Sequence, residues 1–118
     1  MKLCVFPNDP IRAYYEKGEI KENYFNPENI FDEVHIISFT DKDIEEFKVQ
    51  KIVGNAKLVI HAIGNINIKN RKKEIGKIID LVKKISPDII RTYNPLIEGW
   101  CASFVAKNLN IPCFVSLH

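Results

Sequence analysis

Short apolar runs alternate along the chain with longer polar or amphipathic segments. Each run has the length of a single strand and is bounded by proline, glycine or asparagine, which favour turns. Several runs are apolar throughout, which is typical of strands covered on both faces of a parallel sheet. The pattern predicts strands at residues 2–6, 34–39, 57–63, 88–92 and 113–117.

The last third of the chain predicts a strand, a helix and a second strand. Asn94 is a favourable N-cap, and Pro95 suits the first helical position, where its missing N–H is no loss. We therefore expect a helix over residues 95–109. Asn110 can adopt the left-handed conformation that ends a helix, and Pro112 prevents continuation. Apolar side chains leave this helix little polar surface, so we expect it to be covered on more than one side.

Helices are also expected between the earlier strands. Residues 70–85 place apolar side chains at helical spacing, with most lysines facing away. Asp43, followed three residues later by Glu46, has the form of a capping box and favours a helix that Gly54 ends. Part of that segment, residues 48–53, also fits an extended conformation.

The stretch after the first strand is irregular. Residues 11–17 can form one or two helical turns, which Gly18 ends, and an aromatic, charged stretch follows to residue 29. Long segments without periodicity in a compact domain are usually functional or disordered. The aromatic residues argue against disorder here.

Alternating strands and helices predict an α/β fold, a three-layer Rossmann-like domain with a parallel sheet of about five strands. Right-handed crossovers favour the strand order 3-2-1-4-5. In that order the direction of winding reverses between the first and fourth strands. Ligands bind at the carboxyl ends of the strands at such a switch point.

Composition restricts the class of protein. The 118 residues are expected to form one domain, 1–118, and a net charge of +2 gives no support for binding nucleic acid. Three cysteines in predicted core elements, without metal spacing, favour reduced thiols in a cytoplasmic protein. We expect neither a signal peptide nor a membrane span. The basic run at 69–73 is more often a solvated helix face than a lipid-binding or nucleic-acid patch.

Polar and aromatic residues gather where the topology predicts the site. Amides, charges and rings suit a sugar, whose hydroxyls need donors and acceptors and whose C–H faces pack on rings, although loop ends are often polar for no functional reason. The free N–H groups of the helix at 95–109 attract phosphate in some proteins, but such a crossover helix has the same form without a ligand. The predicted substrate-binding residues are Asn8, Asp9, Arg12, Tyr15, Lys17, Tyr93, Asn94 and Glu98, with Tyr14 and Asn65 on the same edge.

Metal binding is not expected. His35 and His61 lie within predicted strands and are interpreted as structural, and the three histidines lack metal-ligand spacing. The sequence Asp41-Lys42-Asp43 has the form of a metal-binding Asp-x-Asp motif, but a helix cap explains it.

Residues 87–118, PDIIRTYNPLIEGWCASFVAKNLNIPCFVSLH, resemble the end of the N-terminal domain of GT-B glycosyltransferases of the family 4 type. The shared features are a Pro-Asp strand, a helix containing glycine, an Ile-Pro strand and a terminal histidine. The resemblance implies that His118 lies in the cleft between two domains and contacts the transferred sugar. The loop at residues 7–10 departs from the family, because it lacks the glycine pair that approaches the donor diphosphate.

The resemblance implies the acceptor-binding half of a sugar transferase that is inactive alone. A C-terminal domain, on a longer chain or a separate subunit, is expected to bind the nucleotide-sugar, and this chain itself is expected to hold no cofactor. The acceptor is a sugar acceptor, lipid-linked in many such enzymes, which leaves contact with a membrane surface open. The alternative is a flavodoxin-like module for small-molecule binding or signalling. A phospho-receiver is a poor fit, since the third strand ends in Gly64-Asn65 and lacks its carboxylates.

Overall fold

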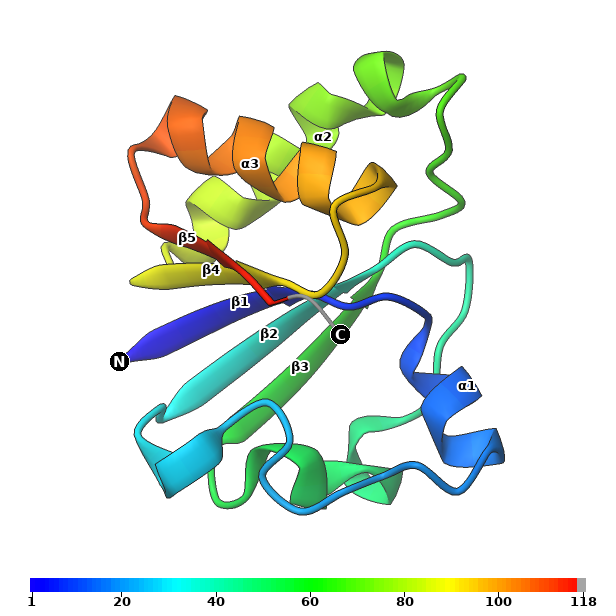
Figure 1. Ribbon diagram of the computed structural model, residues 1–118, viewed down its shortest axis with the longest axis vertical. Helices are drawn as coiled ribbons and strands as arrows, with labels where there is room; N and C mark the ends of the chain where they lie inside the picture. Colours follow the sequence, from blue (N-terminus) through cyan, green and yellow to red (C-terminus); the bar gives the residue numbers. More distant parts are fainter. Residues whose placement is uncertain (117–118) are drawn as a thin grey trace.

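A parallel sheet of five strands in the order β3-β2-β1-β4-β5 forms the centre of the computed structural model, which describes residues 1–116 (Figure 1). This confirms the predicted α/β fold and strand order. The strands are β1 Lys2–Phe6, β2 Glu33–Ser38, β3 Lys57–Ala62, β4 Ile89–Thr92 and β5 Cys113–Val115. All four pairings between neighbouring strands are parallel.

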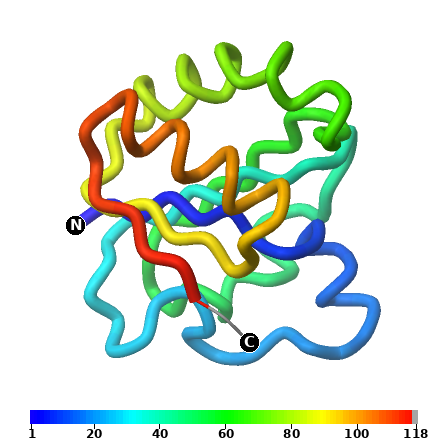
Figure 2. Tube along the Cα trace, turned by 45° about the horizontal axis from the view of Figure 1, so that its top comes forward, coloured from blue at the N-terminus to red at the C-terminus, as the bar shows by residue number. Residues whose placement is uncertain are grey.

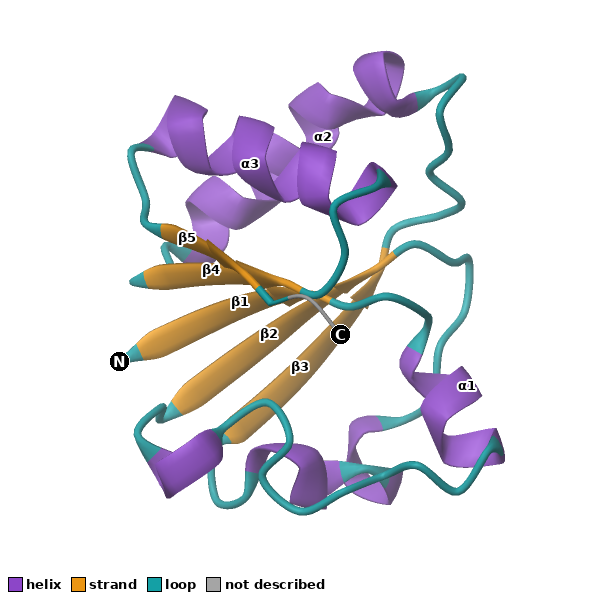
Figure 3. Ribbon diagram, viewed as in Figure 1, coloured by secondary structure: helices purple, strands orange, loops and turns teal. Residues whose placement is uncertain are grey.

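Helical elements lie on both faces of this sheet (Figure 3). The helices α2 (Arg71–Ile85) and α3 (Ile97–Leu109) run side by side over one face, as Figure 2 shows from a second angle. The other face carries α1 (Ile11–Glu16) and three short 3-10 turns, η1 (Pro27–Asn29), η2 (Glu46–Lys48) and η3 (Gln50–Val53). This division follows from right-handed crossovers, because the connections that wind toward β3 and those that wind toward β5 pass over opposite faces.

Alternate side chains of β1 supply the two halves of the core. Leu3 and Val5 point toward the α1 face, and Cys4 and Phe6 point toward α2 and α3. All four are at most 1% exposed. The central strand is therefore buried on both faces, as its continuous apolar sequence predicts.

The helix α3 begins at Ile97 rather than at residue 95. The side-chain Oδ1 of Asn94 accepts the N–H of Leu96 at 2.9 Å, so Asn94 closes a turn before the helix instead of capping its first turn. The predicted end is confirmed, since Asn110 is left-handed with φ 56° and ψ 48°. The helix α3 packs on the sheet and against α2, which confirms the expected cover on more than one side, and its remaining side is open, since Phe104 is 40% exposed.

The helix predicted after Asp43 is wrong. The segment forms only the turns η2 and η3, and the carboxylate of Asp43 accepts the backbone N–H groups of Ile11 and Arg12 at 2.9 and 2.7 Å. Asp43 therefore caps α1, across the sheet edge, and not a helix of its own. The carboxylate of Glu46 accepts the N–H of Ile60 on the edge strand β3, at 2.9 Å.

The long segment between α1 and β2 is held by one buried amide. Asn26 is fully buried, and its Nδ2 donates to the carbonyls of Phe31 and Val53 at 3.0 and 2.9 Å. Its Oδ1 accepts the N–H of Phe31 at 3.0 Å. The segment is thus ordered by polar contacts that its aromatic composition alone does not reveal.

Cover is incomplete on the α1 face of β4 and β5. A groove of about 510 Å³ runs there beside Leu3, Ile89 and Phe114, and Phe114 is 57% exposed. Among residues 1–116, none of the helices has both the length and the apolar content needed to cross a bilayer.

Candidate functional site

The switch point predicted from the sequence lies where β1 and β4 pair. Phe6 is the register partner of Thr92, and the N–H of Tyr93 donates to the carbonyl of Phe6 at 3.3 Å. The loops 7–10 and 93–96 therefore leave the same edge of the sheet from neighbouring strands. We use the name crevice for the region between these two loops, after its place at the switch point of the sheet.

The loop after β1 presents an unsatisfied acceptor at the crevice. The Oδ1 atom of Asn8 is buried and has no hydrogen-bond partner among the residues that the structure describes. Asp9, beside it, is exposed. Burial, and next the charge of Asp9, raise the pKa of the Tyr14 hydroxyl to about 12, so that this group is a neutral donor at neutral pH. A buried acceptor without a partner is costly, and Asn8 is the predicted site residue that has one.

The loop after β4 brings Asn94 and Glu98 together. The Nδ2 of Asn94 donates to a carboxylate oxygen of Glu98 at 2.9 Å, and both side chains are half-buried. Gly99 lies close behind, since a Cβ built there falls 2.3 Å from the backbone oxygen of Asn94. Its lack of a side chain thus serves the packing of the loop on α3.

Tyr93 is part of the core and not an open platform. Tyr93 is only 6% exposed. The centroid of its ring lies 5.3 Å from that of Phe25 and 6.0 Å from that of Tyr24. Burial raises the pKa of its hydroxyl to about 12. The guanidinium of Arg91 lies 5.5 Å from the centroid of the Tyr93 ring, which places a positive charge next to the three aromatic rings.

Three predicted residues, Arg12, Tyr15 and Lys17, lie in α1 or directly after it. Arg12 donates to the hydroxyl of Thr40 and to the carbonyl of Lys42, so it fastens the loop after β2. Tyr15 and Lys17 are exposed, and Lys17 is the residue that ends α1.

His118, the predicted catalytic residue, lies outside the described residues. Ser116, two residues earlier in the sequence, donates its N–H to the carbonyl of Thr92 at 2.9 Å. The Nε of Arg91 donates to the Ser116 hydroxyl at 3.0 Å. The sequence pattern missed Arg91 and Ser116, although a single arginine inside an apolar strand is a signal that could have found the first of them.

The cysteines and histidines form no metal site in the described part of the chain. Burial raises the pKa of Cys4 and Cys113, and that of Cys101 to about 12, so these thiols stay protonated and unreactive at neutral pH. His35 and His61 contact each other on the sheet and not at the crevice.

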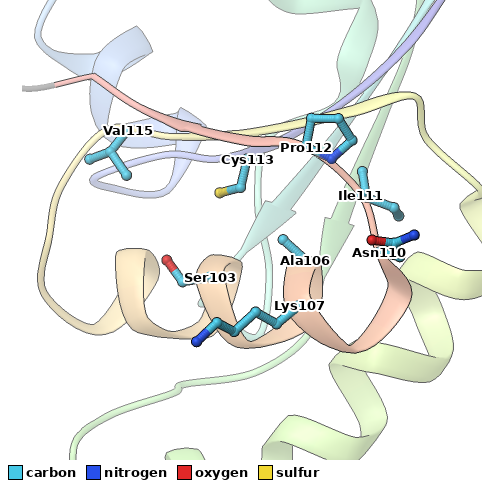
Figure 4. A pocket seen from close by; sticks show the side chains of 8 residues that line it. All are labelled: Ser103, Ala106, Lys107, Asn110, Ile111, Pro112, Cys113 and Val115. Atoms are coloured by element: carbon cyan, nitrogen blue, oxygen red, sulfur yellow. The ribbon is translucent and has the colours of Figure 1, made fainter.

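A separate hollow of about 470 Å³ lies between α3 and β5, and Figure 4 shows Ser103, Lys107 and Cys113 among the side chains around it. It is at the end of α3 away from the crevice. It contains none of the predicted site residues.

Comparison with known proteins gives the fold alone. No family model matches the chain, and no curated protein matches it. Two crystal structures are similar, both of the C-terminal domain of a hydrogenase from Pyrococcus furiosus. The first, of its residues 83–215, has 15% identity and a TM-score of 0.56 over 97% of this chain and 88% of that one. The second, of residues 78–226, has 17% identity and a TM-score of 0.57 over 98% and 90%.

Proposed function

We propose that this chain is the acceptor-binding half of a GT-B glycosyltransferase. The observation that carries the proposal is the position of the segment that resembles those enzymes. It forms β4, α3 and β5, directly beside β1, so the loop at residues 93–96 meets the loop at 7–10 at the switch point. The resemblance and the topology thus point to one place on the molecule.

The chemistry of the crevice suits a hydroxylated ligand. Asn8 offers a buried acceptor, and the paired Asn94 and Glu98 offer an amide and a carboxylate within one helical turn. Vicinal hydroxyls of a sugar can donate to such acceptors and accept from the amide at the same time. We propose that these three side chains orient the acceptor, with Asp9 at the exposed rim.

Transfer itself needs a second domain, which we propose holds the nucleotide-sugar. Precise placement of donor and acceptor accounts for much of the rate of such a reaction, and a half-site cannot supply it. In the resembled family, a histidine at the position of His118 lies between the domains. We propose the cytoplasm as the location of the enzyme, because the three cysteines are free thiols.

Calorimetry on this chain tests whether the donor nucleotide-sugar binds to another domain. We expect UDP-, GDP- and ADP-linked sugars to bind the isolated chain at most weakly, with Kd near or above about 1 mM, because the donor groups are elsewhere. Tight binding of one nucleotide-sugar by residues 1–118 alone would refute the assignment to the acceptor half. Tight binding of a flavin nucleotide would favour the flavodoxin-like alternative instead.

A further inference from the structure

An apolar stripe lies on the outer side of α3. Leu96, Trp100 and Phe104 follow one another at intervals of four residues, which places them along one side of the helix and its start. Leu96 is 70% exposed and Phe104 is 40% exposed. The rings of Trp100 and Phe104 stack with centroids 5.3 Å apart, so the stripe is continuous.

The loop before α2 widens this stripe. Ile68 is 69% exposed, and together with Leu96 and Trp100 it lines a shallow hollow of about 240 Å³. Figure 1 shows the loop before α2 and the start of α3 on the same side of the molecule. Large apolar side chains grouped on a surface in this way usually mark an interaction site.

Basic residues follow Ile68 in the sequence, at the start of α2. Lys69, Lys72 and Lys73 are exposed, and none of them has an ion pair with another residue in the described part of the chain. The guanidinium of Arg71 lies 4.8 Å from the ring of Trp100. Its Nε is buried and has no hydrogen-bond partner within residues 1–116, which leaves an unused donor next to the stripe.

Two acidic residues, Glu74 and Glu98, belong to the same helices. Glu74 pairs with Lys77 at 3.0 Å, while Glu98 accepts a hydrogen bond from the neutral amide of Asn94 and keeps its charge. Lys69, Arg71, Lys72 and Lys73 outnumber these two carboxylates, so the surface combines exposed apolar side chains with a net positive charge.

We propose that this surface, formed by residues 68–73 with Leu96, Trp100 and Phe104, binds the anionic face of a lipid bilayer. Lysines attract acidic headgroups, and Ile68 and Leu96 enter the boundary between headgroups and acyl chains. Tryptophan favours that boundary too.

A nucleic acid fits this surface less well. Single strands bind by stacking bases on free aromatic faces, whereas the Trp100 ring already contacts the guanidinium of Arg71 and the ring of Phe104. A nucleic acid offers no apolar surface that would cover the aliphatic side chains of Ile68 and Leu96. The inference stands on this surface alone and does not depend on sugar transfer, although Leu96 belongs to the loop that borders the crevice.

Trp100 is the single tryptophan of the chain and reports directly on this contact. With vesicles of phosphatidylglycerol and phosphatidylcholine at low salt, we expect its emission to shift to the blue and to be quenched by brominated acyl chains. Pure phosphatidylcholine vesicles should give neither effect, and added salt should release the protein. Unchanged emission together with no co-sedimentation on the anionic vesicles would overturn the proposal.

Matched variants separate this surface from a general effect of charge. Ile68→Glu with Leu96→Glu, and Lys69, Lys72 and Lys73 all changed to Glu, should each weaken vesicle binding at least about tenfold. The first control is Phe47→Glu on η2, where Phe47 is 72% exposed. The second is the double variant Lys83→Glu, Lys84→Glu in the last turn of α2. Both control variants should bind vesicles like the unchanged chain. An equal loss of vesicle binding in the controls would contradict the assignment. So would competition by single-stranded RNA, if the RNA displaces the vesicles and still binds the Ile68→Glu, Leu96→Glu variant.

Discussion

His35 Nδ1 lies 2.9 Å from His61 Nε2, and the two rings stack with centroids 5.2 Å apart. The other nitrogen of His35 lies 2.5 Å from a carboxylate oxygen of Glu33. A carboxylate can only accept, so with both rings neutral His35 donates to Glu33 and accepts the N–H of His61. This chain of hydrogen bonds joins β2 to β3, which agrees with the structural role predicted for both histidines.

The histidine pair predicts an acid-sensitive stability. Burial, and next the neighbouring His35, lower the pKa of His61 below its usual 6.5, while Glu46 acts in the opposite direction. The folded state then binds fewer protons than the unfolded state, so the free energy of unfolding falls as the pH drops below about 6.5. Urea unfolding from about pH 7.5 to about pH 5 measures this fall.

The variant His61→Gln is the control for that titration. Its amide N–H can still donate to His35, and it takes up no proton in this range. We expect a flatter dependence of the unfolding free energy on pH. If its slope equals that of the unchanged chain, His61 is not the group responsible.

Two glycines in helices should respond to alanine in opposite ways. At Gly99 a Cβ would lie 2.3 Å from the backbone oxygen of Asn94, so Gly99→Ala must push the loop away from α3 and should cost about 1–3 kcal/mol. At Gly76 in α2 no atom lies within 4 Å of the new Cβ, so Gly76→Ala should add about 0.5–1 kcal/mol. Denaturant unfolding of both variants checks the pair, and a stable Gly99→Ala variant would show that the loop packs differently.

Asp43 should matter for stability more than its exposed neighbour Asp41. Its carboxylate accepts the N–H groups of Ile11 and Arg12 and the hydroxyl of Ser38 at 2.6 Å. Bonds to a charged acceptor are worth about 1.5–3 kcal/mol, so we expect Asp43→Ala to lower the unfolding free energy by that amount. Asp41→Ala should change it by less than about 0.5 kcal/mol. Equal effects at the two positions would mean that α1 does not depend on this cap.

The helix predicted after Asp43 shows where a local sequence pattern is not sufficient to predict structure. A capping box and helical spacing are local signals, and the partners of Asp43 and Glu46 are backbone N–H groups on α1 and β3, far away in the chain. Strand order, in contrast, follows from handedness and from mostly apolar runs such as β1 and β4, so it could be predicted.

The position of the candidate site on the sheet could be predicted from the sequence, but not every residue that belongs to it. Topology located the loops that carry Asn8 and Asn94. It could not show that Tyr93 turns into the core, or that Arg12 bonds to the loop after β2, because side-chain direction depends on packing. The partner of Arg91 at Ser116 is likewise a contact between strands far apart in the sequence.

His118 carries a prediction that rests on the resemblance. In the complete enzyme we expect His118→Ala to lower kcat at least about tenfold with a smaller change in KM, since a bond made mainly in the transition state affects turnover. His61→Ala, within β3, should lower stability more than turnover. Steady-state kinetics and thermal melts of the two variants decide this, and full activity in His118→Ala would remove the residue from the site.

The most direct measurement is sugar transfer by the complete product of the gene, including any residues encoded beyond His118. Release of nucleoside diphosphate would be followed for UDP-, GDP- and ADP-linked sugars, with and without candidate acceptors. We predict acceptor-dependent release from at least one donor, its loss on changing Asn8 and Asn94 to Ala, and no release by residues 1–118 alone. No acceptor-dependent release from any donor, or full transfer by the Asn8 and Asn94 variant, would contradict the account.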